Sequence, residues 1–282
     1  MSSSAPISPT RLRQIALVAE DLEKAKHLLT YILGTEVVFI DPAVKKWGLE
    51  NFLVAIGGDI IEVVSPFQPN TSAGRLLYKR GDGGYMIIMQ TTDAVARRSY
   101  IESNNLGKVI YSHEHDDAVC IQYHPKGIKG GIIPELDSHR PSPINPEPVA
   151  STFSPWHACG SNYESYAAGM RRCAHLHLSE AVCRLAPGDT DTEKAAKQWE
   201  ETFGTRRIQN SLEFTNGCLR FAPGVKGKPE GIASITIAVE SSKNMNDILD
   251  RAREKGLWKD GWIDMLGIRW YLSRAADGNS RL

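Results

Sequence analysis

A pattern of one strand, one helix and three further strands recurs along this chain of 282 residues. In the first copy, residues 12–18 alternate and are rich in β-formers, as in a half-buried strand. Asp21 then begins a helix whose apolar residues follow the helical period, and Gly34 stands where a C-cap belongs. Three more strands are predicted, at 36–41, 51–57 and 59–65. The first unit is therefore a βαβββ module.

A second copy of the module follows a polar, glycine-rich stretch at 68–84. Its first strand is predicted at 85–91, and its helix runs from Asp93 to about residue 104. Three strands complete it, at about 107–114, 118–124 and 131–137.

The two copies share one frame. In each, a first-strand residue lies seven positions before the residue that begins the helix: Gln14 before Asp21, and Met86 before Asp93. In each, a glutamate lies four positions after a glycine: Glu62 after Gly58, and Glu135 after Gly131. A carboxylate within an apolar run is costly to bury unless it is paired or bound to a metal. The repetition indicates that both glutamates are functional.

Four prolines in the stretch 138–148 exclude a helix or a central strand there. Weaker copies of the module follow at about 173–223 and 231–273, the first with an Asn216-Gly217 hairpin and the second ending in one predicted strand at 262–272. The domains predicted are residues 10–138, a proline-rich linker or lid at 139–170, and a degenerate second domain at 171–275. The fold class is α+β.

The charge balance restricts the partners. Lys plus Arg and Asp plus Glu each number 33, so the formal net charge is zero, which argues against nucleic acid and polybasic membrane binding. No stretch is long and apolar enough to span a membrane, and no secretory signal is visible. The five cysteines contain no C-x-x-C pair, which is typical of reduced intracellular thiols. A small-molecule substrate is the expected partner, and a homodimer is left open.

Paired βαβββ modules with a glutamate near the end of each resemble the vicinal oxygen chelate superfamily, which includes glyoxalase I, methylmalonyl-CoA epimerase, extradiol dioxygenases and bleomycin-resistance proteins. The resemblance covers about 12–137 well and 173–273 weakly, as in a tandem double-domain member. It implies that paired modules form cupped mixed sheets. It also implies a divalent metal held by four inward positions, on the first and last strands of the modules.

Mapped onto this chain, those four positions are Gln14, Glu62, Met86 and Glu135. Carboxylate and carboxamide oxygens suit Mg, Mn, Fe or Zn ions, whereas the Met86 thioether does not. His124, at the end of a predicted strand, is a replacement ligand and a candidate catalytic residue beside Glu62 and Glu135. A site without metal is the alternative, in which paired glutamates with raised pKa values act as general acid and base.

For the other histidines and for the linker, a structural role is the alternative to a functional one. His113 and His115 form an H-x-H pair at the end of a predicted strand, a spacing compatible with a metal site that combines Glu135 with His115 or His124. A solvated polar turn is the alternative. The aromatic segment from Trp156 to Tyr166 predicts either a lid over the first domain or a segment whose aromatic side chains pack between the two domains. In the second domain Phe221 and Tyr271 occupy the glutamate positions, so no metal site is expected there. No nucleotide-binding loop is present, so no organic cofactor is expected.

These residues predict a glyoxalase-like enzyme that acts on a small oxygen-rich molecule by proton transfer, as an isomerase, epimerase or lyase. A non-catalytic binding or resistance protein is the main alternative, because Met86 breaks the ligand set. A ring-cleaving dioxygenase is a further alternative, disfavoured because Gln14 and Met86 are not histidines. The tail Ser280-Arg281-Leu282 is a variant of the S-K-L address and predicts a peroxisomal location if the source is eukaryotic, and a cytoplasmic one otherwise.

Overall fold

A computed structural model describes residues 7–275, so the predicted address at 280–282 lies outside the described residues. Within them, sixteen strands form two eight-stranded sheets that contain both parallel and antiparallel pairs. The first sheet has the order β2-β3-β4-β1-β5-β8-β7-β6, and the second has the order β10-β11-β12-β9-β13-β16-β15-β14. Each sheet is therefore built from two βαβββ modules, which confirms the predicted α+β class.

The elements of the first half are β1 (Thr10–Val18), α1 (Leu22–Leu33), β2 (Val37–Phe39), a short 3-10 helix (Pro42–Trp47), β3 (Leu49–Ile56), β4 (Asp59–Pro66), α2 (Ser72–Arg80), β5 (Gly83–Thr91), α3 (Ala94–Ser103), β6 (Val109–Glu114), β7 (Ala118–Tyr123) and β8 (Ile133–His139). A 3-10 turn (His157–Cys159) and α4 (Tyr163–Arg172) follow. The second half contains β9 (Leu176–Arg184), α5 (Thr192–Phe203), β10 (Arg206–Ile208), β11 (Ser211–Glu213), β12 (Cys218–Ala222), β13 (Gly231–Val239), α6 (Ser242–Glu254), β14 (Trp258–Lys259), β15 (Trp262–Met265) and β16 (Ile268–Arg274).

Local sequence explains where the first helix begins and ends. The Asp21 side chain accepts a hydrogen bond from the Lys24 backbone N–H, which satisfies one of the unpaired donors at the start of α1. Gly34 ends the helix at φ +70°, a left-handed conformation that costs least for a residue without Cβ. Both predicted ends of this helix are confirmed.

Two features of local structure differ from the sequence prediction. Helix α2 lies within the glycine-rich stretch 68–84, where its N-cap Thr71 accepts a hydrogen bond from the Gly74 N–H. The predicted single strand 262–272 is divided into β15 and β16, because Leu266 and Gly267 both have positive φ and reverse the chain.

By packing, the described residues group into two compact units that interleave along the sequence. Unit 1 contains 7–14, 86–157 and 180–233, and unit 2 contains 15–85, 158–179 and 234–275. Each unit therefore combines a module of the first half with a module of the second. The boundaries predicted at 138–139 and 170–171 stay a prediction about the sequence, whereas the units describe packing.

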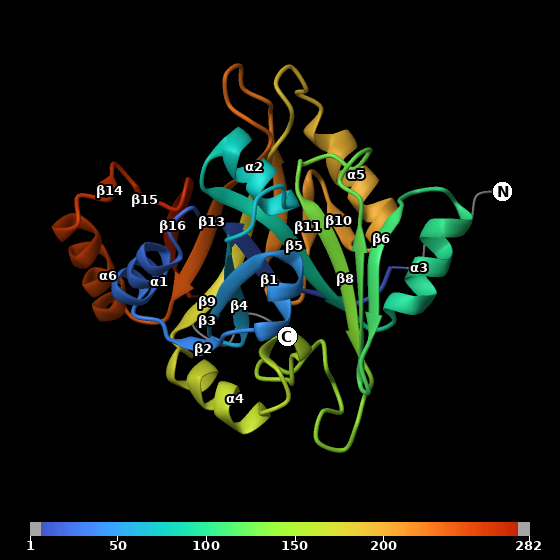
Figure 1. Ribbon diagram of the computed structural model, residues 1–282, viewed down its shortest axis with the longest axis horizontal. Helices are drawn as coiled ribbons and strands as arrows, with labels where there is room; N and C mark the ends of the chain where they lie inside the picture. The colour runs from blue at the N-terminus through green and yellow to red at the C-terminus, as the bar shows by residue number, and fades with distance from the viewer. Residues whose placement is uncertain (1–6, 276–282) are drawn as a thin grey trace. The chain divides into compact units, whose positions relative to one another are not determined.

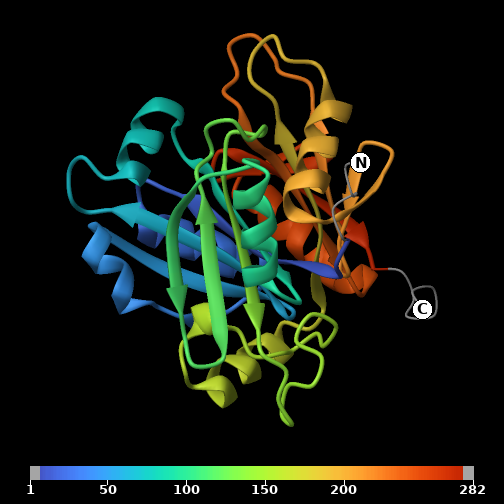
Figure 2. The same cartoon turned by 90° about the vertical axis from the view of Figure 1, so that its right-hand side faces the viewer.

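Within unit 1, α3 packs on β7 and β8, and Figure 2 shows it beside these green strands. Its Arg97 donates to three carbonyl groups at the end of α5 (Thr192–Phe203), where helix carbonyls lack intrahelical partners. The Asn216 side chain, from the predicted hairpin, both donates to and accepts from the Leu12 backbone of β1. Contacts between modules of the two halves thus hold unit 1 together.

Within unit 2, α1 and α6 lie side by side (Figure 1). The Tyr31 hydroxyl donates to the Glu254 carboxylate at 2.6 Å, and the Arg251 guanidinium donates to the Ile32 carbonyl oxygen. No helix among residues 7–275 is long and apolar enough to cross a membrane.

Candidate active site on strand β8

Three polar side chains occupy one face of β8, because every second residue of a strand points to the same side. These are Glu135, Asp137 and His139, with exposed fractions of 7, 0 and 3 %. Burial of two carboxyl groups on consecutive positions of one face is costly unless the groups are paired or bound to a ligand. This part of β8 is therefore the strongest candidate for a functional site in unit 1.

Strand pairing places the neighbours of this row. In the parallel partner β5, Ile88 lies beside Glu135 and Gln90 beside Asp137. In the antiparallel partner β7, Gln122 lies opposite Glu135 and Cys120 opposite Asp137. The Gln122 amide forms a side-chain hydrogen bond with Glu135. Within their own sheet the two carboxyl groups thus have neutral neighbours and no basic side chain beside them.

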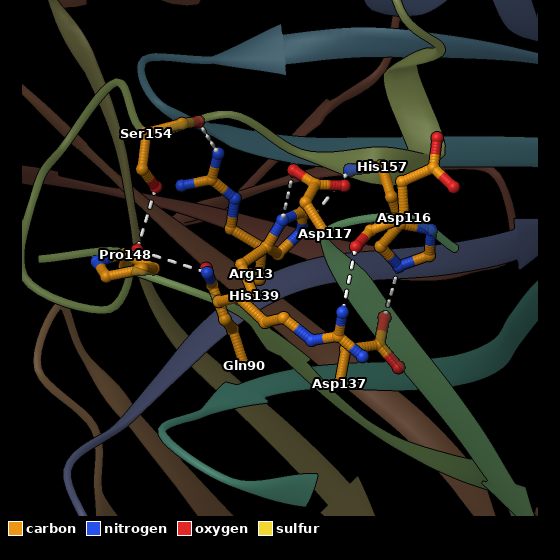
Figure 3. Close-up of polar contacts among 10 residues, drawn as sticks. Arg13, Gln90, Asp116, Asp117, Asp137, His139, Pro148, Ser154 and His157 are labelled. Atoms are coloured by element: carbon orange, nitrogen blue, oxygen red, sulfur yellow. Dashed lines mark hydrogen bonds and ion pairs between the residues drawn. The ribbon is translucent and has the colours of Figure 1, made fainter. Parts of the chain in front are cut away.

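The linker supplies the residue that completes the group. His157, in the short 3-10 turn, shares a 2.7 Å hydrogen bond between its Nε2 and Asp137 Oδ2, and Figure 3 shows the two side chains pointing toward one another. One donor atom from each of Glu135, Asp137 and His157 lies within 4.8 Å of the other two. Residues 20 apart in sequence, on a strand and a linker, are thus brought to one point.

The linker segment is fixed by buried groups of β1 and β5. The Arg13 guanidinium donates to the Ser154 carbonyl oxygen at 2.7 Å (Figure 3). The same guanidinium lies over the Trp156 ring. The Trp156 indole N–H donates to Gln14 Oε1 at 2.7 Å, and this ring is only 1 % exposed. Gln90 donates to the Pro148 carbonyl oxygen. These contacts bind residues 148–157 to the rest of unit 1, and we name this segment the strap.

Electrostatics favours a shared proton on the carboxyl pair. Burial raises the pKa of Glu135 well above its ordinary value, and the nearby charge of Asp137 raises it further. Burial also raises the pKa of Asp137, although the hydrogen bond from Glu135 opposes that rise. Both carboxyl groups therefore have raised pKa values, which favours one proton held between them.

His139 is held as a neutral imidazole. Burial lowers its pKa to about 4, and the charge of His157 contributes to the decrease. Its Nε2 accepts a long hydrogen bond of 3.4 Å from the His157 backbone N–H, and its Nδ1 lies 3.6 Å from the exposed Asp117 carboxylate. The imidazole therefore connects β8 to the strap without adding charge to the site.

The residues predicted from the sequence have different environments. Glu135 belongs to the buried group, whereas Glu62 belongs to unit 2, is half-buried and accepts a 2.6 Å hydrogen bond from the Asn51 amide. Gln14 is buried against Trp156, and Met86 is buried on β5. His124 is exposed, and its Nδ1 accepts from the Lys126 N–H of a local turn. Ligand or catalytic roles for Gln14, Glu62 and His124 stay predictions.

Asp137, His139 and His157 are not among the site residues predicted from the sequence. A signal for the first two exists: the run Glu135-Leu-Asp137-Ser-His139 is polar at every second position, as expected for one face of a strand. For His157 no local signal exists, because its partner lies on another element.

The resemblance implies a divalent metal, and the buried group fits one. Two carboxylates and an imidazole are suitable ligands for Zn, Fe or Mn ions. Asp137 Oδ1 is buried and, among residues 7–275, has no hydrogen-bond partner of ordinary geometry. Among these residues Glu135, Asp137 and His157 are also the group of three or more acidic, histidine or cysteine side chains whose donor atoms converge.

Comparisons with known proteins address the fold. No family model matches the sequence, and no curated protein matches it. A hypothetical protein from Staphylococcus aureus aligns over 94 % of this chain and 99 % of its own, with 11 % identity and a TM-score of 0.62. Methylmalonyl-CoA epimerase from Mycobacterium tuberculosis aligns over 50 % of this chain and 94 % of its own, with 20 % identity and a TM-score of 0.42. A Streptomyces coelicolor methylmalonyl-CoA epimerase variant in complex with 2-nitronate-propionyl-CoA aligns over 47 % of this chain and 99 % of its own, at 21 % identity and a TM-score of 0.42.

The full-length alignment shows that the arrangement of two successive halves is shared with another protein. Together with two βαβββ modules per sheet, it supports the predicted α+β fold of paired modules in tandem.

Proposed function

We propose that this chain is an isomerase- or epimerase-type enzyme that moves a proton on a small oxygen-rich organic substrate. The observation that carries the proposal is the buried pair of Glu135 and Asp137, which are hydrogen-bonded to each other, with Asp137 also bonded to His157. Catalytic acids and bases need pKa values near the working pH, and burial beside a second carboxyl group raises that of Glu135 in this direction.

Each residue has a defined task in this proposal. Glu135, the more exposed of the two carboxyl groups, exchanges its proton with the carbon next to a substrate carbonyl. Asp137 accepts hydrogen bonds from Glu135 and His157 and so orients both groups. The His157 imidazole, held by the strap, donates a hydrogen bond to the oxygen on which charge develops. A divalent metal held by the same three residues would supply further polarisation of adjacent substrate oxygens.

Deuterium exchange tests the function directly, because it reports proton transfer whichever product the reaction forms. The full chain is incubated in D₂O with 2-hydroxy ketones, 2-oxo acids and branched acyl thioesters, and NMR follows deuterium at the carbon next to the carbonyl. We expect exchange with one of these classes, and a loss of about 10²-fold or more in Glu135→Gln. Equal exchange by wild type and Glu135→Gln would remove Glu135 from the reaction.

A non-catalytic binding protein is the second candidate. It is favoured by Met86 at a predicted ligand position and by Gln14, whose amide oxygen accepts from Trp156. This function predicts saturable binding of one compound of the same panel with no deuterium incorporation. The ring-cleaving alternative needs two histidines on one iron, whereas the buried group of unit 1 contains one.

A further inference from the structure

We propose that Glu135, Asp137 and His157 bind one divalent cation, with the nitrogen ligand supplied by the linker and not by a first strand. The family resemblance places two of its four ligands on first strands, at Gln14 and Met86. Of those four positions, Glu135 alone belongs to this site. The assignment does not depend on the proton-transfer function, because a binding protein can hold the same ion.

The first-strand positions are poorly suited to the ion. The Oε1 atom of Gln14 already accepts a 2.7 Å hydrogen bond from the buried Trp156 indole. Met86 offers a thioether, which is a ligand for soft cations and not for hard or borderline divalent ones. The donors of unit 1 that do converge lie farther along β8 and on the strap.

The converging donors have the chemistry of a metal site. Their atoms lie within 4.8 Å of one another, and ligands around an ion with bonds of about 2.0–2.3 Å lie about 3–4 Å apart. Asp137 is fully buried, and its Oδ1 has no partner of ordinary geometry among the described residues. A carboxylate oxygen in that state is stabilised by a bound cation. The independent observation is therefore a buried carboxylate oxygen within the group that has no hydrogen-bond partner of ordinary geometry among residues 7–275.

The strap holds the third ligand in place before any ion binds. The Pro148 carbonyl oxygen accepts from both Gln90 and the Ser154 hydroxyl, and the Ser154 carbonyl oxygen accepts from Arg13. Trp156 and Ser154 are buried, so the backbone on the N-terminal side of His157 is fixed. A pre-positioned ligand loses little conformational entropy on binding, which favours affinity.

The donor set also limits the kind of ion. Two carboxylates and one imidazole suit Mn²⁺, Fe²⁺ or Zn²⁺, whereas Ca²⁺ and Mg²⁺ prefer ligands that are all oxygen. Mn²⁺ is the probe of choice, since its free form gives a direct EPR signal and bound Mn²⁺ broadens the NMR signals of nearby protons.

The test uses the full chain, stripped with a chelator and titrated with Mn²⁺ alone. We expect one Mn²⁺ per chain, and affinity weaker by about 100-fold or more in His157→Ala and Asp137→Asn, because loss of outer partners alone costs about 10–100-fold. His27→Gln is the matched control, since His27 is an exposed histidine of α1, in unit 2, stacked on Tyr31. Its affinity is expected to stay close to that of wild type.

Broadening of the His157 ring protons by Mn²⁺, assigned from their absence in His157→Ala, locates the ion independently of any loss of affinity. Asp137→Asn keeps the side-chain shape, and circular dichroism confirms that each variant is folded. Absence of stoichiometric Mn²⁺ in wild type, or unchanged affinity in folded His157→Ala, would overturn the proposal. If the ion binds but no substrate exchanges deuterium, the cation site stands and the proton-transfer function is wrong.

Discussion

Glu62 on β4 and Glu135 on β8 occupy the same position in two copies of one module, yet their surroundings differ. The residue two positions on is Val64 in β4 and Asp137 in β8, and it points to the same face. Glu62 is half-buried and accepts a hydrogen bond from Asn51, whereas Glu135 is buried against a second carboxyl group. The repeat sets where a glutamate stands, and the next residue on its face sets its chemistry.

The largest expected effect is on activity. Glu135→Gln is expected to lower the rate of deuterium exchange by about 10²–10⁴-fold, because it removes the group that carries the proton. Glu62→Gln is expected to lower the rate far less, since Glu62 is hydrogen-bonded to the Asn51 amide and not to a second carboxyl group. Rates of both variants under saturating substrate check the contrast, and equal losses would show that both glutamates serve the reaction.

A second expected effect separates the two arginines of β1. Arg13→Gln is expected to lower the rate of deuterium exchange and to destabilise the fold by about 1.5–3 kcal/mol. The reason is that Arg13 donates to the Ser154 carbonyl oxygen in the strap, close in sequence to His157. Arg11→Gln is the matched control, since Arg11 donates to Ser151 and Thr152 at the earlier part of the strap. Urea unfolding and exchange rates, measured together, should show a loss of exchange only in Arg13→Gln.

A third expected effect concerns stability and pH. The pKa of Glu135 is raised in the folded state, so its contribution to stability is present below its unfolded pKa and is lost as pH rises through the folded pKa. Glu135→Gln should therefore gain stability relative to wild type as pH rises above the unfolded pKa of about 4.3. Thermal unfolding measured across a series of pH values tests it. A constant difference between Glu135→Gln and wild type would contradict it.

The smallest expected effect concerns the next position on the same face, which is Pro66 in β4 and His139 in β8. Burial lowers the His139 pKa to about 4, so stability is lost as pH falls from its unfolded pKa of about 6.5 toward 4. His139→Gln cannot titrate and should lose about 0.7 kcal/mol less than wild type between about pH 7 and 6. Chemical unfolding at both pH values measures this, and identical losses would show that His139 is not held neutral.

Much of the fold follows from local pattern. The period of α1, its Asp21 cap and its Gly34 ending are encoded within a few residues of each element. Helix α2 is less visible, because its stretch is polar and glycine-rich and its stability comes from packing on β4 and the Thr71 cap. The division of β15 from β16 depends on positive φ at Leu266, which a β-rich run does not reveal.

The site is predictable from the sequence only in part. Glu135 stands out because Glu62 occupies the same position in the other module. Asp137 can be found from the polar residues at every second position of the same strand. His157 is not, because its position depends on buried contacts of the strap with Arg13, Gln14 and Gln90, and none of these has a sequence signature. Contacts between elements far apart in the chain decide which polar residues become a site.

The two hydrogen bonds between the Asn216 side chain and the Leu12 backbone have a consequence for how such a chain can evolve. A tandem protein of two similar halves would ordinarily be open to recombination, with one half replaced by that of a relative. Here the first strand of one half takes a side chain of the other as the partner of its backbone, and Arg97 caps a helix of the other half. A crossover at the midpoint would separate partners that were selected together, so the two halves are expected to be inherited as one.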